Sequence, residues 1–145
     1  MRMDLLEVAE FFHGHLGPFL VLGLKAGLCL TRKFGRNPLK SSATIMLPLR
    51  KPYTCFIDGF QLATGCTLGK MNINVVEWKD GIKVKYVLNE HVFHLTVRKS
   101  ILDNVIRKLK YGEDMHSIAS LLLNMRDDEL FILEKHNNFR RVILD

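Results

Sequence analysis

The chain has 145 residues, of which 48% are hydrophobic and 25% charged, a composition typical of one globular domain that needs no disulfide framework. No hydrophobic run approaches the roughly 18 residues needed to span a bilayer, and the N-terminus lacks a signal-peptide pattern, so a cytoplasmic location without membrane insertion is expected. The net charge is +6, and eight Lys/Arg against three acids in residues 1–52 carry most of it. A basic face is able to attract anionic substrates or nucleic acid, but no aromatic-basic motif accompanies these charges, so a solvated surface is expected rather than a nucleic-acid partner.

The first predicted elements are two helices separated by a break. Hydrophobic residues at helical spacing predict a short amphipathic helix over residues 4–12. The segment His13–Pro18 interrupts it with two glycines, and its proline suits the first position of a second helix over residues 18–34. That helix is apolar on most sides, and Gly23 and Gly27 permit close backbone approach. We expect it to be central or buried in a subunit contact.

His13 and His15 stand in the loop that leads into the second helix. Side chains two residues apart in an extended segment point to the same side, so both imidazoles are able to face one ligand. The helix N-terminus beside them offers free N–H groups and positive potential, which favour an anion. The alternative interpretation is that one histidine caps the helix while the other is hydrogen-bonded in the core.

Strands dominate the middle of the chain, and helices its last third. The predicted strands are 43–49, 72–78, 82–88 and 91–98, and the predicted helices are 101–110, 114–125 and a short start at 127–129. Between the second and third of these strands, Asp80-Gly81 is a strong hairpin signal. Ser100 and Asp103 resemble a capping box at the start of the helix that follows.

The densest set of reactive side chains lies in residues 55–70. The spacing predicts a helix over residues 55–64, and Gly65 then provides a stop because glycine easily adopts the left-handed conformation. Cys55 and Asp58 share one face of this helix. A helix does not need so many polar groups for packing alone, so the segment indicates a functional site.

The cysteines do not have zinc-finger spacing, since Cys55 and Cys66 are eleven residues apart. A site assembled in space from His13 or His15 with these two thiols would suit Zn, Ni or Fe(II) better than Mg or Ca. Two other interpretations stay open. Cys66 is a candidate thiolate nucleophile activated by Lys70 or a histidine, and both cysteines are also candidates for small buried hydrophobes.

Two motifs of this chain together resemble those of a known family. They are Phe12-His13-Gly14-His15-Leu16-Gly17-Pro18 and Cys55-x2-Asp58-x2-Gln61-x2-Thr64-Gly65-Cys66-Thr67-Leu68-Gly69-Lys70. On these residues the chain resembles the FmdE-like family, which takes its name from a component of formylmethanofuran dehydrogenase, over most of residues 5–135. The resemblance implies an α+β fold with a mixed sheet of about five strands flanked by helices, often as a dimer.

The resemblance also implies a site. The family's motif residues surround a pocket that binds a metal in some members, and some members occur alongside the molybdenum or tungsten formylmethanofuran dehydrogenase of methanogenic metabolism. The matching positions are His13, His15, Cys55, Asp58, Gln61, Thr64, Cys66, Thr67 and Lys70. Two departures stand out. First, this chain has Gly17 where the family commonly has cysteine. Second, many members have a cysteine-rich C-terminal zinc-finger domain, whereas we expect a single core domain over residues 1–145 here.

These observations predict an FmdE-like protein that binds a divalent transition metal (Zn, Ni or Fe) or a small anionic ligand. The predicted metal ligands are His13, His15, Cys55 and Cys66; the predicted cofactor-binding residues are Gln61, Thr64 and Thr67; and the catalytic candidates are Cys66, Lys70 and Asp58. No substrate or reaction is predicted. The alternative is a non-catalytic accessory subunit that docks on a larger redox enzyme or forms a homodimer.

Overall fold

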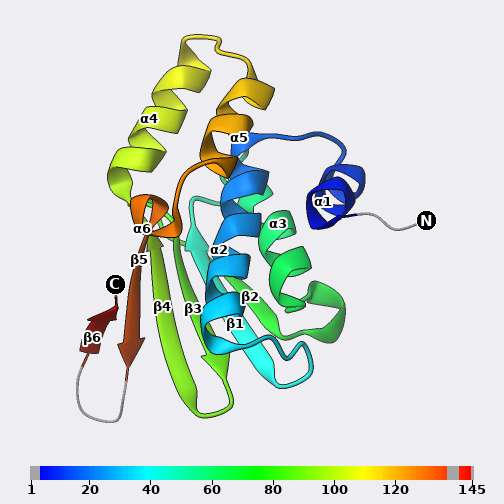
Figure 1. Cartoon of the computed structure of the whole chain (residues 1–145), viewed down its shortest axis with the longest axis vertical. Helices are drawn as coiled ribbons and strands as arrows, with labels where there is room; N and C mark the ends of the chain where they lie inside the picture. The colour runs from blue at the N-terminus through cyan, green and yellow to red at the C-terminus, as the bar shows by residue number, and fades with distance from the viewer. Residues whose placement is uncertain (1–3, 137–140, 145) are drawn as a thin grey trace.

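A computed structural model describes residues 4–136 and 141–144 and has an α+β architecture around one mixed sheet (Figure 1). The six strands of the described residues follow the order β2-β1-β3-β4-β5-β6. The strands are β1 (Ser41–Leu47), β2 (Ile73–Glu77), β3 (Lys83–Leu88), β4 (His91–Val97), β5 (Phe131–His136) and β6 (Arg141–Leu144). The helices are α1 (Leu5–His13), α2 (Pro18–Phe34), α3 (Cys55–Thr64), the 3-10 turn η1 (Leu68–Lys70), α4 (Lys99–Lys110), α5 (Met115–Leu123) and α6 (Asp127–Leu130). The predicted fold class is confirmed, with one strand more than expected because β6 pairs with β5.

Strand direction brings three chain segments to one edge of the sheet. β1 is parallel to β2 and antiparallel to β3, and β3 is antiparallel to β4, so β1, β2 and β4 end at the same edge. This is the upper edge in Figure 1, above which α4 stands. We call it the carboxyl edge of the sheet.

The predicted hairpin across Asp80-Gly81 is wrong, because β1 lies between β2 and β3 in the sheet. The parallel pairing of β2 with β1 requires a crossover connection, and α3 supplies it. A two-residue hairpin turn forms instead between β3 and β4, at Asn89 and Glu90. Asn89 adopts a φ of 55°, which suits such a turn.

α2 and α3 approach each other so closely that glycine is required on both helices. A Cβ atom on Gly23 would lie 1.9 Å from the carbonyl oxygen of Phe56, and one on Gly59 would lie 2.2 Å from that of Leu20. The predicted close approach along α2 is therefore confirmed, but its neighbour is α3 of the same chain. This face of α2 is occupied within the chain and lends no support to a subunit contact.

One face of the sheet packs against α2. Burial alternates along β3, where Val84 and Tyr86 are fully buried. The rings of Phe34 and Phe93 stack with their centroids 3.7 Å apart, and the hydroxyl of Tyr86 donates to the carbonyl of Gly35 at 3.1 Å. These contacts fix the end of α2 over β3 and β4.

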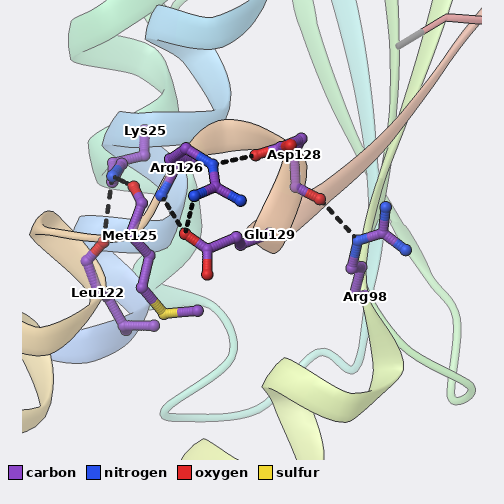
Figure 2. A network of polar contacts seen from close by, with 7 residues as sticks. All are labelled: Lys25, Arg98, Leu122, Met125, Arg126, Asp128 and Glu129. Carbon is purple, nitrogen blue, oxygen red and sulfur yellow. Dashed lines mark hydrogen bonds and ion pairs between the residues drawn. The ribbon is translucent and has the colours of Figure 1, made fainter.

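A network of polar contacts joins α2 to the segment between α5 and β5 (Figure 2). The ammonium group of Lys25 donates to carbonyl oxygens at the C-terminal end of α5, those of Leu122, Leu123 and Met125. Further along, the guanidinium of Arg98 donates to the carbonyl of Asp128 at 3.0 Å, which attaches α6 to the end of β4. Both attachments depend on backbone carbonyls as acceptors.

Helix starts follow the sequence signals with one exception. Asp114 caps α5 and accepts from the N–H of Ser117, as expected. The predicted capping box at Ser100 is wrong, because α4 already begins at Lys99 and Arg98 at its N-cap makes no side-chain cap. Within residues 4–136 and 141–144, no helix has both the length and the apolar character needed to cross a membrane.

Candidate functional site

The candidate site is built around His13 and Asp58, which lie 45 positions apart in the sequence. α1 ends at His13 because Gly14 adopts a left-handed φ of 104° and its N–H bonds to the carbonyl of Glu10. Asp58 lies in the first turn of α3. The packing of α1 against α3 brings the ring and the carboxylate together.

His13 and Asp58 share a short hydrogen bond. Nδ1 of the ring lies 2.6 Å from Oδ2 of the carboxylate, and the two side chains are 11% and 34% exposed. An ionised carboxylate only accepts, so Nδ1 carries the proton and Nε2 of the neutral ring holds a lone pair. Nε2 is buried and has no hydrogen-bond partner among the described residues. A ligand that bonds to Nε2 would remove the cost of leaving a buried polar atom unpaired.

The ring of His15 lies beside the ring of His13. Their centroids are 4.8 Å apart with an interplanar angle of 52°, in keeping with the spacing of two residues. His15 itself is exposed. A Cβ atom on Gly17 would lie 2.9 Å from Cε1 of His15, so the ring leans over the backbone at that position. A cysteine there, as in the family that the sequence resembles, would force the ring to shift.

Cys55 is the first residue of α3, one helical turn before Asp58. Burial raises the pKa of its thiol, the negative charge of Asp58 raises that pKa further, and the charge of Lys51 acts in the opposite direction. The thiol is therefore protonated at neutral pH and a weak nucleophile unless a metal ion replaces the proton.

Cys66 lies beyond the other end of α3. The ten residues of α3 cover about 15 Å, whereas two thiolates on one metal ion each lie only about 2.3 Å from it. Cys66 is fully buried, with its Sγ 3.3 Å from Oγ of Ser41. The structure therefore divides the predicted ligand set, with Cys66 in the core and Cys55 at the histidine end. A buried Sγ also gives a substrate no access, which removes the support for Cys66 as a nucleophile.

The remaining predicted site residues hold the turn that follows α3. Oε1 of Gln61 accepts from the N–H of Leu68 at 2.8 Å, and the hydroxyl of Thr64 donates to a backbone carbonyl one turn earlier in α3. The ammonium group of Lys70 donates to the hydroxyl of Thr67 at 2.8 Å and to a backbone carbonyl. These contacts give the four side chains a structural role, and ligand binding by them stays a prediction.

Asn72 organises the same turn, although the sequence did not single it out. Its Oδ1 accepts from the N–H of Thr67 at 2.8 Å, and its Nδ2 donates to the carbonyls of Pro38 and Ser41 at 2.9 and 3.1 Å. Two of these partners lie more than 30 positions away in the sequence. No local pattern could have indicated them.

In the part of the chain that the structure describes, no three His, Cys, Asp or Glu side chains form a group able to hold a metal ion as they stand. A metal bound at Nε2 of His13 would therefore complete its coordination through rotation of side chains, through water or through an added ligand. Metal binding stays a prediction on this geometry.

Comparison with known proteins places both motifs in a family. The chain is 35% identical over 102 residues to a protein of Archaeoglobus fulgidus named "Probable S-adenosyl-L-methionine-binding protein", a match that covers 61% of this chain and 28% of that protein. The chain thus spans under a third of the length of this relative. Residues 12–132 match the family described as "FmdE, Molybdenum formylmethanofuran dehydrogenase operon", a range that includes the His13–Asp58 pair and the strands from β1 to β4. The chain belongs to the FmdE family.

Proposed function

We propose that this FmdE-family chain binds a divalent transition metal ion at Nε2 of His13, with Asp58 holding the ring in place. The observation that carries the proposal is the unpaired, buried Nε2 on a ring whose Nδ1–H is bonded to a carboxylate. Metal-ligating histidines nearly always donate their second N–H to such a group, which fixes the tautomer and makes the ligand more basic. Imidazole nitrogen suits Zn, Ni and Fe(II).

His15 and Cys55 are the side chains proposed to join His13 at the metal. The ring of His15 lies beside that of His13, and Cys55 begins the helix that carries Asp58. Because burial and Asp58 raise the pKa of the Cys55 thiol, the metal would have to displace a proton there, and affinity should increase with pH. A small anion beside the two imidazoles is the alternative occupant of the same place.

The test is metal retention by untagged protein after loading with Zn, Ni or Fe(II), followed by desalting and elemental analysis. We expect about one equivalent in the wild type and a loss of affinity of about 10- to 100-fold in Asp58→Asn, because an uncharged amide oxygen is a weaker acceptor than the carboxylate that orients the ring. His13→Ala should abolish retention. His116→Ala, which removes an exposed imidazole on α5, is the matched control and should retain metal. Wild-type protein without metal above trace, or full retention by His13→Ala, would refute the assignment.

S-adenosyl-L-methionine is a second candidate ligand, and the name of the Archaeoglobus relative favours it. The chain covers 28% of that protein, so this support depends on whether the matched part holds the ligand. Calorimetric titration of S-adenosyl-L-methionine into the same wild-type protein decides between the two candidates. If metal-free wild-type protein binds S-adenosyl-L-methionine and the His13→Ala variant still does so, the second candidate is favoured.

The family description supports a wider setting for the site. We place the chain in the cytoplasm, linked to formylmethanofuran or molybdenum/tungsten redox metabolism, in keeping with the operon that names the family. A role as an accessory subunit of a larger redox enzyme, or as a homodimer, belongs to the same proposal. The glycine face of α2 does not support it, since α3 covers that face.

A further inference from the structure

Three chain segments enclose a cavity of about 560 Å³ at the carboxyl edge of the sheet. Pro48 and Tyr53 follow β1, the turn Lys79–Gly81 follows β2, and α4 follows β4. Ligands often bind outside the carboxyl ends of parallel strands, and β1 and β2, which are parallel, both end at this edge. We call this cavity the α4 groove.

One face of α4 lines the groove along its whole length. The lining positions are Lys99, Leu102, Asp103, Ile106, Arg107 and Lys110, which recur every three or four residues. Leu102 is buried and Ile106 half-buried, so they form an apolar floor between charged ends. Lys99 and Lys110 are separated by about 16 Å along the helix axis.

Four cations line the groove, and they outnumber the acids that line it. Lys79, Lys99 and Lys110 make no ion pair within the described residues, and the guanidinium of Arg107 donates to the amide oxygen of Asn104 at 2.6 Å. Two acids, Asp80 and Asp103, also line the groove, which leaves an excess of positive charge. A cleft with an excess of one sign of charge attracts ligands of the opposite sign.

From this arrangement we infer that the α4 groove binds a small organic polyanion, a molecule with phosphate or carboxylate groups joined by an apolar or aromatic scaffold. A volume of about 560 Å³ lies within the usual range for small-molecule sites, and the apolar floor with cations at both ends matches such a scaffold. A nucleic acid would need an open basic track rather than a concave cavity. The inference is independent of metal binding at His13.

Tyr53, which lines the groove, lies shortly before the start of α3. The ring of Tyr53 lies 5.1 Å from that of Phe19 at the start of α2, and Tyr53 precedes Cys55 by two residues. A ligand in the groove would therefore lie next to the segment that carries the start of α3. Trp78, which is the single tryptophan of the chain, lies against Gly81 at the groove wall and provides a fluorescent reporter.

The experiment is a fluorescence titration at low ionic strength with adenosine triphosphate and with azelate, an elongated dicarboxylate. We expect saturable binding of at least one probe, with a Kd raised about tenfold or more in Arg107→Gln/Lys110→Gln. The matched control, Lys40→Gln/Lys85→Gln, removes the same charge from exposed positions outside the groove and should change the Kd less than about twofold. Binding of one probe alone identifies phosphate or carboxylate as the preferred group.

Three results would overturn the inference. The first is saturation by neither probe, and the second is equal weakening by the groove variant and the control. The third is tighter binding of a single-stranded oligonucleotide that both variants weaken alike, which would indicate a diffuse basic surface. His13→Ala should leave probe binding unchanged, so failure of the groove and failure of the metal site are distinguishable.

Discussion

His13 shows how one residue acquires its role from a distant partner. Its spacing from His15 indicated only that two rings share a side, whereas the bond to Asp58 fixes which ring nitrogen is paired and which is left unpaired. That bond could not be predicted from spacing, because it depends on how α1 packs on α3. Residue types thus identified the candidate residues, and tertiary contacts determined which of their atoms are hydrogen-bonded.

His94 should make the stability of the protein depend on pH. Burial, together with the nearby charges of His136, Lys83 and Lys85, lowers its pKa to about 4 against the opposing effect of Glu134. Between pH 6.5 and 4 the unfolded chain binds the proton first, so stability should fall as the pH falls through this range, by at most about 3 kcal/mol. Urea denaturation at pH 7 and pH 5 measures this.

His94→Gln should flatten that dependence, because it removes the buried titrating group. His116→Gln removes an exposed histidine and should leave the slope as in the wild type. Equal slopes in both variants would show that other groups cause the loss at acid pH.

At the scale of elements, α3 combines two tasks. Its first turn carries Asp58 to the site, and its body packs against α2 through glycine contacts. The same helix joins β1 to its parallel neighbour β2. The signal at Asp80-Gly81 had instead predicted that β2 pairs with β3 in a hairpin. A dipeptide reports local turn preference, whereas strand pairing depends on contacts far along the chain.

Gly23→Ala should destabilise the protein by about 3 kcal/mol, because the new methyl group would overlap the carbonyl of Phe56 and push the helices apart. Gly69→Ala is the control, since no atom lies within 4 Å of its added Cβ, and it should change stability by less than about 0.5 kcal/mol. The free energy of unfolding in urea measures both. Similar values for the two variants would contradict the close packing of α2 on α3.

On the scale of the whole molecule, Lys25 connects the α2–α3 layer to the helices above the sheet (Figure 2). Burial lowers the pKa of its ammonium group, yet the three carbonyl acceptors at the C-terminal end of α5 stabilise the charged form. The carboxyl edge of the sheet then gathers α3, α4 and the loops between them. The α4 groove lies at this edge, where the loop after β1 leads into α3.

Lys25→Met should cost about 2 kcal/mol of stability, because it leaves carbonyl oxygens at the end of α5 without their donor. Lys40→Met changes an exposed lysine and should be nearly neutral. Denaturant unfolding gives the two free energies, and hydrogen exchange of the α5 amides should be faster in Lys25→Met alone. No difference between the variants would mean that the contacts at Lys25 contribute nothing.

The sequence by itself determined the local elements. Helical periodicity fixed the helix over residues 18–34, and the glycine at position 65, with a φ of 75°, ended the helix over 55–64 as predicted. Such features depend on neighbours a few residues away. The sequence also contains the two motifs of the FmdE family, and the family match over residues 12–132 confirms that membership.

Only the tertiary structure decided which of these elements and side chains meet. It inserted β1 between β2 and β3, joined His13 to Asp58, and buried Cys66 against Ser41 far from Cys55. The reason is physical: pairing of strands and burial of thiols are set by contacts between segments distant in the chain, about which local periodicity carries no information.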